Sequence, residues 1–203
     1  MDRWSQLASE SSIEKAVSSL KVNGIEAVVV ENGESAKKKI LEIIPEGSEV
    51  MNMTSVTLDA IGVSSEITKS GRFKPVRNKL TSMDSKTQGL EMKKLGSAPE
   101  WVVGSVHAVT EDGKVLVASA SGSQLPAYAY GASKVVWIAG TQKIVKNMEE
   151  GIKRIYEHSL PLEDQRARKA YGIGSSVNKI LIFNKEFVPG RVILILVKEE
   201  LGF

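Results

Sequence analysis

Apolar positions in the first half of the chain alternate between helical and strand patterns. Helical spacing begins after a cap at Ser11 or Ser12 and recurs over 34–44. Each helical segment is followed by a short apolar run, 25–30 and 48–53, which indicates a buried strand. Helices that alternate with strands favour an α/β fold built on a largely parallel sheet.

The clearest local signals lie between 104 and 131, where strand, turn and helix patterns follow one another directly. Apolar and polar residues alternate, and a second apolar run begins after the dipeptide Asp112-Gly113, which suits a type I′ hairpin turn. A two-residue loop at this turn would place Glu111 opposite Lys114. We therefore expect an antiparallel hairpin here.

A loop of small residues follows the hairpin and opens a helix. We expect Ser123 to be its N-cap and Pro126 to lie in its first turn, where the missing N–H costs little. A helix start presents free N–H groups and the positive end of the helix dipole, which suit an anion. The predicted ligand-binding residues of this loop are Ser121, Gly122, Ser123 and Gln124.

A second helix start follows the predicted strand 48–53. Its residues Thr54, Ser55 and Thr57 carry hydroxyl groups, and in open α/β sheets ligands collect at the carboxyl ends of strands. Capping of the helix by these hydroxyl groups is the alternative, because Ser and Thr commonly begin helices. Both interpretations stay open from the sequence.

The second half of the chain adds a helix whose first residue follows Asn147. Asn147 is expected to cap this helix, and the pairs Glu149–Lys153 and Glu150–Arg154 are expected on its outer face. Its inner face is expected to carry Met148, Ile152, Ile155 and Tyr156.

Three further strands are predicted, at 135–140, 179–183 and 191–197, whereas 70–99 shows no clear pattern apart from a weak helix. Together with the hairpin, these strands predict a three-layer α/β sandwich with a mixed, mostly parallel sheet.

Length and composition fit one globular domain over 1–203, in which 1–10 is expected to be a loose N-terminal segment. The hydrophobic content of 42% is sufficient for a substantial core. The 27 basic and 24 acidic residues are interspersed and aromatic residues make up only 5%, which argues against nucleic-acid binding.

The chain contains no cysteine, which excludes disulfides, cysteine nucleophiles and an iron–sulfur cluster held by its own thiolates. Its two histidines, His107 and His158, are too few for a histidine-rich metal site. No run approaches the roughly 20 apolar residues that span a bilayer, and the N-terminus lacks a signal-peptide core. We therefore expect a cytoplasmic protein without a membrane span.

Five segments in succession carry a family resemblance: TSVTLDAIG (54–62), GSVHAVTEDG (104–113), SGSQLPAYAYG (121–131), KVVWIAGTQKIV (134–145) and PGRVILILVKEELGF (189–203). Together they resemble the lactate-utilisation, or LUD-domain, family, in particular its C-component-like members. The resemblance covers roughly residues 10–203.

The resemblance implies the fold shared by CoA transferases, ribose-5-phosphate isomerase and 5-formyltetrahydrofolate cyclo-ligase. It also implies a role in the oxidation of L-lactate to pyruvate, in which family members act as subunits of a multi-protein system. Some relatives and partner subunits carry cysteine clusters for iron–sulfur centres, and this chain departs from them. Electron transfer would therefore fall to a partner subunit.

Glu111 is the candidate catalytic residue. The segment Thr-Glu-Asp-Gly resembles the Ser-Glu-Asn-Gly segment that carries the nucleophilic glutamate of some CoA transferases, and a carboxylate there would attack an acyl thioester. The alternative is a hairpin ion pair with Lys114. His107 has two possible roles, acid–base catalysis or simple packing in a strand. Lys143 also has two, contact with an anion or an exposed position on a loop.

Three functions remain open from the sequence alone. The first is a non-redox subunit of a lactate-oxidising assembly that binds iron–sulfur subunits. The second is a small-molecule enzyme that uses CoA or a nucleotide, with a pocket joining Thr54–Thr57, Glu111 and Ser121–Gln124. The third is a regulatory module with the same pocket and no turnover. A homodimer is the oligomeric state that we consider for a domain of this type.

Overall fold

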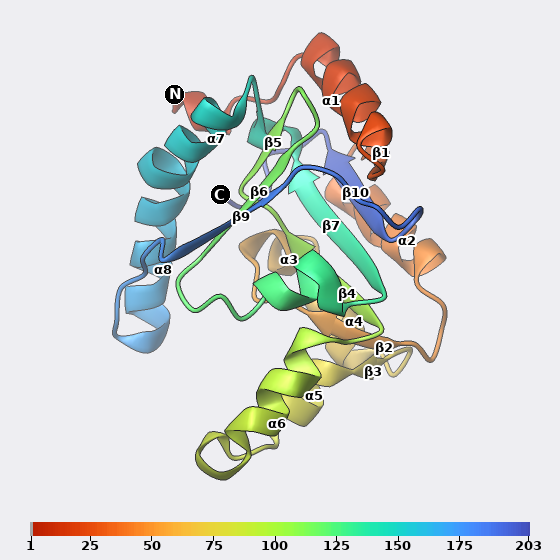
Figure 1. Cartoon of the computed structure of the whole chain (residues 1–203), viewed down its shortest axis with the longest axis vertical. Coiled ribbons are helices and arrows are strands. Elements are labelled where there is room, and N and C mark those ends of the chain that lie inside the picture. The colour runs from red at the N-terminus through yellow and green to blue at the C-terminus, as the bar shows by residue number, and fades with distance from the viewer. Residues whose placement is uncertain (1) are drawn as a thin grey trace.

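The alternating helices and strands of the chain build one parallel sheet, shown in Figure 1 in a computed structural model that describes residues 2–203. All of its neighbouring strands run parallel. In spatial order the six strands are β1 (Glu26–Val30), β10 (Val192–Val197), β7 (Lys134–Gly140), β4 (Trp101–Ser105), β2 (Glu49–Asn52) and β3 (Lys74–Pro75).

The antiparallel strands form a second, four-stranded sheet and do not extend the first. Its spatial order is β8 (Ile144–Val145), β5 (Ala108–Thr110), β6 (Val115–Ser119) and β9 (Lys179–Phe183). β6 pairs antiparallel with both β5 and β9, whereas β5 and β8 are parallel. The predicted α/β class with mixed, mostly parallel strand pairing is confirmed.

Eight α-helices connect the strands: α1 (Glu10–Val22), α2 (Gly33–Ile43), α3 (Val56–Ala60), α4 (Val63–Lys69), α5 (Val76–Thr81), α6 (Ser85–Ser97), α7 (Met148–Arg154) and α8 (Leu160–Tyr171), as counted over residues 2–203. Short 3-10 turns lie at Arg3–Ser5 and Thr141–Lys143, and single π-turns at Ala127–Gly131 and Ile155–Ser159. The predicted cap of the first helix at Ser11 or Ser12 is wrong, because Ser9 Oγ accepts from the Ser12 N–H at 3.2 Å.

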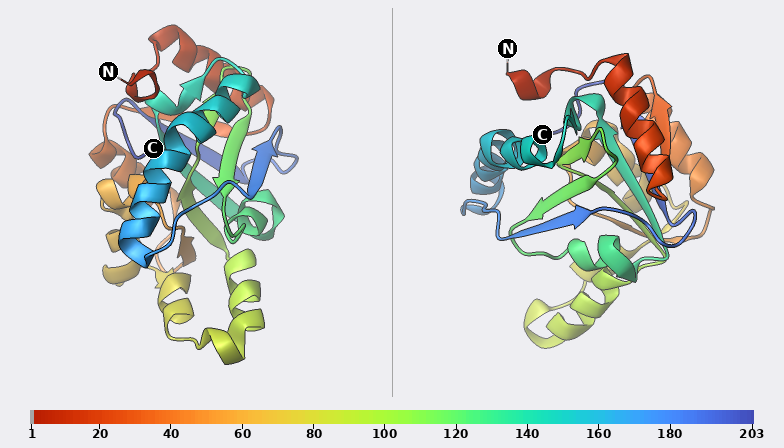
Figure 2. Two further views of the ribbon diagram at one scale, coloured as in Figure 1. Left: turned by 90° about the vertical axis from the view of Figure 1, so that its left-hand side faces the viewer. Right: turned by 45° about the horizontal axis from the view of Figure 1, so that its top comes forward.

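Alternate residues of the central strands point to two different cores. On β7, Val135, Trp137 and Ala139 pack toward α1 and the second sheet. Val136 and Ile138 pack on the opposite face, against α2, α3 and α4. The far face of the second sheet is covered by a smaller cluster that includes Ile152 and Ile155. Figures 1 and 2 show how α7 lies beside this sheet. The strand period of two thus places each sheet between two apolar layers.

The inner face of α7 differs from the predicted one. Met148 and Tyr156 are 42% and 48% exposed, whereas Gly151 and Arg154 are buried. A Cβ on Gly151 would lie 3.0 Å from Leu116 Cδ2, so the missing side chain lets the helix approach β6 closely. The π-turn that follows adds a residue to the turn and rotates the later positions, which a regular helical period does not anticipate.

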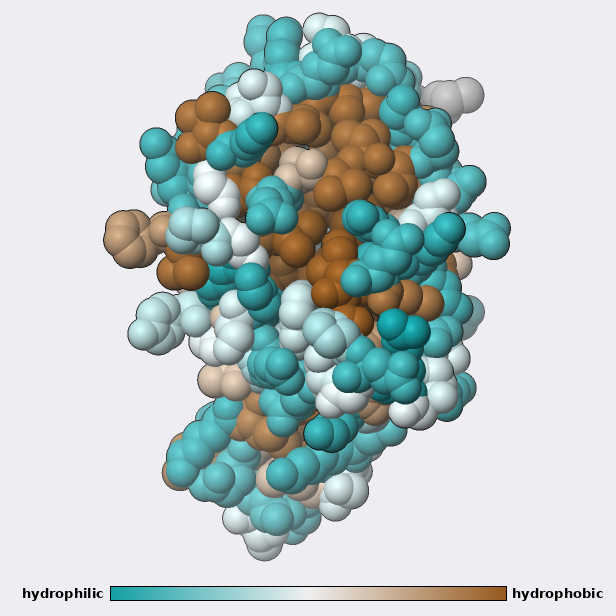
Figure 3. Space-filling model, turned by 90° about the vertical axis from the view of Figure 1, so that its right-hand side faces the viewer, coloured by the Kyte–Doolittle hydropathy of each residue, from teal (hydrophilic) through white to brown (hydrophobic). Residues whose placement is uncertain are grey.

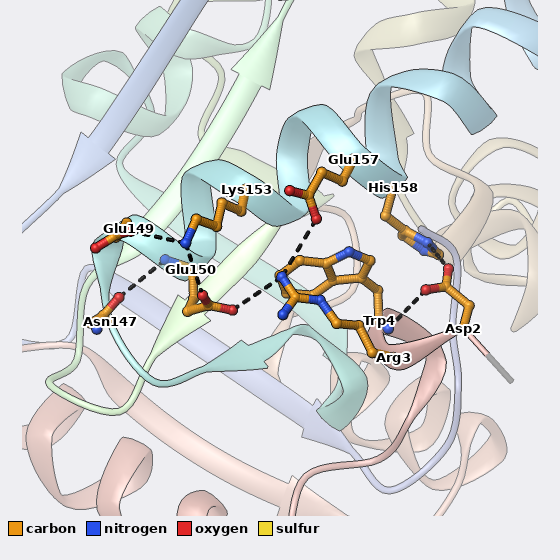
Figure 4. A network of polar contacts seen from close by, with 9 residues as sticks. All are labelled: Asp2, Arg3, Trp4, Asn147, Glu149, Glu150, Lys153, Glu157 and His158. Atoms are coloured by element: carbon orange, nitrogen blue, oxygen red, sulfur yellow. Dashed lines mark hydrogen bonds and ion pairs between the residues drawn. The ribbon is translucent and has the colours of Figure 1, made fainter.

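The N-terminal segment packs on the domain, unlike the loose segment expected over 1–10. Trp4 is buried, and Asp2 Oδ2 lies 2.6 Å from His158 Nδ1. Arg3 lies 3.3 Å from a carboxylate oxygen of Glu150 and 3.4 Å from one of Glu157. Figure 4 shows these contacts with α7 and the π-turn after it. Met1 lies outside the described residues, and the assignment of 1–203 to one domain stays a prediction.

The region 70–99, which shows no clear sequence pattern, forms β3, α5 and α6. α6 has no buried residue and projects from the body of the protein together with α5 (Figure 2). A helix without a buried face leaves little hydrophobic periodicity in the sequence, which explains the weak pattern. Over residues 2–203, no helix is long and apolar enough to cross a membrane.

Candidate functional site

A cavity of about 850 Å³ opens at the carboxyl ends of three parallel strands. The segment Met53–Thr57 follows β2, Ser105 ends β4, and Lys143 lies in the turn after β7, and all of them line the cavity. The loop after β6 and helix α8 form its opposite wall. This is the position at which open parallel sheets usually bind ligands. A smaller hollow of about 450 Å³ adjoins it.

Lys143 is the central polar residue of this cavity. Its side chain is buried, with 1% of the residue exposed, and its Nζ atom donates to Thr57 Oγ1 at 3.2 Å and to Ser105 Oγ at 3.1 Å. Ser105 Oγ donates to Thr57 Oγ1 at 3.1 Å, and Thr57 Oγ1 donates to the Leu201 carbonyl at 3.3 Å. Three strand ends therefore bring one amine and two hydroxyl groups together. We call Lys143, Thr57 and Ser105 the Lys143 cluster.

No carboxylate among residues 2–203 forms an ion pair with Lys143. Burial, and then the positive charge of Arg154, lower the pKa of Lys143 to about 7. An ammonium group without a counter-ion is expensive to bury, so the neutral amine gains population as the pH rises past this value.

His107 lies beside the Lys143 cluster and also lines the cavity. Its Nδ1 accepts from the Ala118 N–H at 3.1 Å, which places the ring proton on Nε2. Burial, and then the charges of Lys143 and Arg154, lower the pKa of His107 to about 3. His107 is therefore neutral over the physiological range and offers an N–H donor.

Arg154 lies behind His107 and is fully buried. Its Nη1 donates to the His107 carbonyl at 2.7 Å and to Ser159 Oγ at 3.2 Å, while Nε and Nη2 have no hydrogen-bond partner within residues 2–203. Burial lowers the pKa of Arg154 to about 10, so it remains charged at neutral pH. The predicted outward pair with Glu150 is wrong, because α7 turns this side chain toward the second sheet.

Basic side chains outnumber acidic ones along the rest of the cavity wall. Arg77 donates to the Asn52 carbonyl through Nε at 3.0 Å and through Nη2 at 2.6 Å. Arg166 forms two hydrogen bonds of 2.7 Å with Glu163. The charged lining residues are Lys93, Arg77, Arg166 and Lys143 against Asp59 and Glu163. This balance favours an anionic ligand.

The structure brings the two predicted ligand-binding segments together. Thr54, Ser55 and Thr57 line the same cavity as Ser121, Gly122, Ser123 and Gln124. Ser55 Oγ also accepts from the Leu58 N–H at 3.4 Å, so capping of α3 is observed as well. Ligand binding by these residues stays a prediction.

Two of the N–H groups of the loop 121–124 are hydrogen-bonded to nearby serine side chains. The Gly122 N–H donates to Ser119 Oγ at 2.8 Å and the Ser123 N–H to Ser121 Oγ at 3.2 Å. Ser123 caps no helix, because the turns that follow form only a short helical segment ending in the π-turn. The loop contributes hydroxyl groups and a side-chain amide to the cavity.

Glu111 lies outside the cavity, at the tip of the β5–β6 hairpin. The turn contains three residues, with Thr110 N–H donating to the Lys114 carbonyl and Gly113 at φ 79°, so Glu111 and Lys114 do not face each other. Glu111 lies 3.6 Å from Lys15 of α1 instead. The predicted pocket that joins Glu111 to the two hydroxyl-rich segments is therefore not formed.

Of the two interpretations of Lys143 left open by the sequence, the exposed loop position is wrong, because only 1% of the residue is exposed. The segment Thr141-Gln142-Lys143 follows the buried strand β7 directly. The rule that selected Thr54–Thr57, a polar segment at the carboxyl end of a strand, applies equally here.

Within residues 2–203 no group of His, Asp and Glu side chains is arranged to hold a metal ion.

Comparison with known proteins identifies one family and a similar fold. The family model described as the LUD domain matches residues 13–197. A DUF162 family protein from Deinococcus radiodurans superimposes with a TM-score of 0.58 at 11% identity, covering 95% of this chain and 99% of that chain. Ribose 5-phosphate isomerase from Plasmodium falciparum gives a TM-score of 0.36 at 14% identity, covering 78% and 80% of the two chains. No curated protein sequence matches the chain.

Proposed function

Because this chain belongs to the LUD-domain family, which is associated with lactate utilisation, we propose that it is a non-redox subunit or accessory of a system that oxidises L-lactate to pyruvate. We further propose that it binds a small carboxylate or a related anion in the cavity at the strand ends, and that it acts in the cytoplasm. The observation that carries the proposal is the charge of the cavity, in which basic side chains outnumber acidic ones around a buried amine.

The non-redox role follows from the chemistry of the residues. Oxidation of lactate to pyruvate releases two electrons and two protons, and an acceptor must take up the electrons. The chain has no cysteine with which to hold an iron–sulfur cluster by thiolates. A partner subunit with such clusters would supply the acceptor, and this chain would bind or position the organic acid.

An exposed apolar face supports association with a partner. Figure 3 shows hydrophobic residues gathered on the face that carries α1, the β1 edge of the parallel sheet and α2. The exposed apolar residues Val22, Phe187 and Val188 lie close together, because the Glu186 N–H donates to the Asn23 carbonyl at 2.8 Å. Exposed apolar patches of this kind commonly mark interaction sites.

A second candidate function follows from the size of the cavity. A volume of about 850 Å³ falls within the range of drug-sized ligands and exceeds what a three-carbon acid fills. A CoA- or nucleotide-dependent small-molecule enzyme, or a ligand-binding regulatory module, would use the same basic wall for phosphate groups.

A thermal-shift titration tests the anion site. Purified protein is titrated with L-lactate, pyruvate, ATP, CoA and acetyl-CoA, and a ligand at 100 times its Kd should add about 2.7 kcal/mol of stability. The variant Ser123→Asp adds a negative charge to the cavity wall and should lose the effect, whereas Ser18→Asp, on the exposed side of α1, should keep it. Absence of stabilisation by every anion would reject the cavity as the site.

Partner association has a separate test. The tagged chain is purified under anaerobic conditions, and the co-purifying proteins are analysed for iron and acid-labile sulfide. Stoichiometric recovery of an iron–sulfur protein, lost when Phe187 and Val188 are both replaced by Ser, supports the subunit role. Recovery of the chain alone under these conditions contradicts it.

A further inference from the structure

We propose that Lys143 is a nucleophile that forms a Schiff base with a 2-oxo acid bound in the cavity. The inference rests on the anion site proposed above and deepens it, because it names the substrate class and the reacting atom. A 2-oxo acid combines a carbonyl carbon, which an amine attacks, with a carboxylate, which the basic wall attracts.

The surroundings of Lys143 suit a reactive amine better than a structural one. A buried structural lysine normally pairs with a carboxylate, because an unpaired ammonium group is costly away from water. Within residues 2–203, Nζ forms hydrogen bonds only with the hydroxyl oxygens of Thr57 and Ser105, at 3.2 Å and 3.1 Å. A methionine of similar length would fill the same space without this cost, so the amine has no evident value for folding.

The charged and titratable groups around Lys143 keep a share of the amine neutral. Arg154 is a buried cation that repels a second positive charge, and His107 is neutral and offers no compensating charge. The acidic lining residues Asp59 and Glu163 form no ion pair with Lys143. Desolvation together with a neighbouring cation is an established way to activate lysine nucleophiles.

The hydrogen-bond donors of the cavity suit the rest of the substrate. His107 carries its proton on Nε2, which has no protein partner within residues 2–203, and the Ser105 hydroxyl lies next to the amine. These groups are available to a carbonyl or carboxylate oxygen placed over Lys143. Arg77 and Arg166 add positive charge to the same cavity. A carboxylate is therefore favoured beside the carbonyl that reacts.

The chemical step is balanced without a further reactant. The Nζ lone pair attacks C2 of the oxo acid, the C–N bond forms, and the carbonyl π-bond breaks toward oxygen. The two protons of the amine pass to that oxygen, the C–O bond breaks, and water leaves. The products are an imine of Lys143 and one molecule of water, with no net change in oxidation state.

Reductive trapping of the full chain tests the inference. The protein is incubated with pyruvate and cyanoborohydride somewhat above pH 7, where the amine is largely neutral, and analysed by intact and peptide mass spectrometry. We expect one adduct, with the mass of pyruvic acid less one oxygen atom, on the peptide that contains Lys143. L-Lactate, which has no carbonyl group, should give none.

Variants separate Lys143 from other lysines. Lys143→Met and Lys143→Arg should abolish the adduct, whereas Lys38→Met, which removes an exposed lysine of α2 outside the cavity, should retain it. An adduct spread over surface lysines, or one that persists in both Lys143 variants, would overturn the inference. Circular dichroism of each variant verifies that it is folded.

The thermal-shift titration distinguishes this inference from the function on which it rests. If pyruvate stabilises the wild type but no adduct forms on Lys143, the Schiff base is rejected and the anion site stands. If pyruvate neither stabilises nor modifies the protein, both proposals fail for this acid. Stabilisation together with a Lys143 adduct supports both.

Discussion

At the scale of single residues, burial and not residue type decides which side chains have altered chemistry. The protein has many lysines, yet the one at position 143 combines 1% exposure with the absence of a carboxylate partner among the residues that the structure describes. Arg154 is also fully buried, whereas Arg168, for example, forms an exposed ion pair with Asp164. Lys143 and Arg154 both lie around His107, and their two charges lower the pKa of its imidazole further.

Replacing Lys143 by Met is expected to raise the free energy of unfolding near neutral pH. Burial lowers the pKa of Lys143 from 10.5 to about 7, so between these values the unfolded chain binds more protons than the folded one. The stability of the wild type should therefore rise with pH across this window and be lowest below about pH 7, and the Met variant should lack this rise. Urea unfolding of both proteins at a series of pH values measures the difference.

The matched control is Lys93→Met, which removes an exposed lysine of the same cavity and should change the pH dependence little. An identical pH dependence in the wild type and Lys143→Met would show that the amine remains hydrated in the folded protein.

Gly104 in β4 is expected to tolerate no side chain. A Cβ at this position would overlap the Tyr128 hydroxyl and lie 2.7 Å from Tyr128 Cζ, and Tyr128 is itself buried edge-on against Trp137. Gly104→Ala should therefore lower the free energy of unfolding by about 1–3 kcal/mol. Gly89→Ala in α6, where nothing lies within 4 Å, should be neutral or slightly stabilising. Urea unfolding curves give the free energy of unfolding of both variants. A loss in Gly104→Ala alone indicates an effect of packing, whereas an equal loss in both indicates a general effect of replacing Gly by Ala.

At the scale of elements, short irregular turns place the functional groups, and regular helices and strands support them. The 3-10 turn Thr141–Lys143 brings the amine to the end of β7, α7 carries the buried Arg154, and the π-turn after it carries the buried His158. The hairpin β5–β6 carries Glu111 away from the cavity toward α1. α8 closes the cavity on one side and carries Glu163 and Arg166.

Neutralising Glu163 on α8 is expected to strengthen anion binding. Glu163 accepts two hydrogen bonds of 2.7 Å from Arg166, and its negative charge offsets part of the positive charge of the cavity wall. In Glu163→Gln the affinity for pyruvate or phosphate should rise by up to roughly fivefold at low salt, because the pair is partly exposed and its energy is modest. The gain should shrink as salt is added. Isothermal titration calorimetry at two ionic strengths measures it.

Glu42→Gln on α2 is the control for this prediction. Glu42 forms an ion pair of 3.2 Å with Lys39, which is also three positions away in the sequence, but it lies outside the cavity. Equal affinities of Glu163→Gln and Glu42→Gln would show that Arg166 does not face the ligand.

At the scale of the whole molecule, the two sheets share one core. Leu194 of β10 and Val109 of β5 belong to the same apolar cluster, and Trp137 packs edge-on against Phe183 of β9 with ring centroids 5.3 Å apart. The lining of the cavity is drawn from both sheets and from α8. Stability of the core and shape of the cavity therefore depend on the same contacts.

We expect the protein to unfold in one cooperative transition, because the larger apolar cluster of the second sheet also contains residues of the parallel sheet, such as Leu194 and Trp137. Far-UV circular dichroism and tryptophan fluorescence should give coincident urea curves. In Trp4→Phe the fluorescence reports only Trp101 and Trp137, and its curve should still coincide. Separate transitions would indicate that the chain consists of two folding units and not the single domain predicted for 1–203.

The sequence by itself determined the elements and their class. Apolar periods of 3.6 and 2 record which face of a segment is buried, so β1, α2, β2, β7 and β10 lie where the pattern predicts them. Polar segments after strands also identified Thr54–Thr57 and Ser121–Gln124, which meet in one cavity. The apolar pattern did not predict the structure where a helix has no buried face, as in α6. It also failed where a π-turn interrupts the helical period, as after α7.

Only the tertiary structure decided which polar residues meet. Lys143 contacts Thr57 and Ser105, which are 86 and 38 positions away, and no local period encodes such a contact. The exclusion of Glu111 depends on the break between β4 and β5 and on a three-residue turn, whose carbonyls accept hydrogen bonds from Asn23 at the end of α1. Burial of an amine is a property of the neighbours that surround it, so its shifted pKa appears only once the chain has folded.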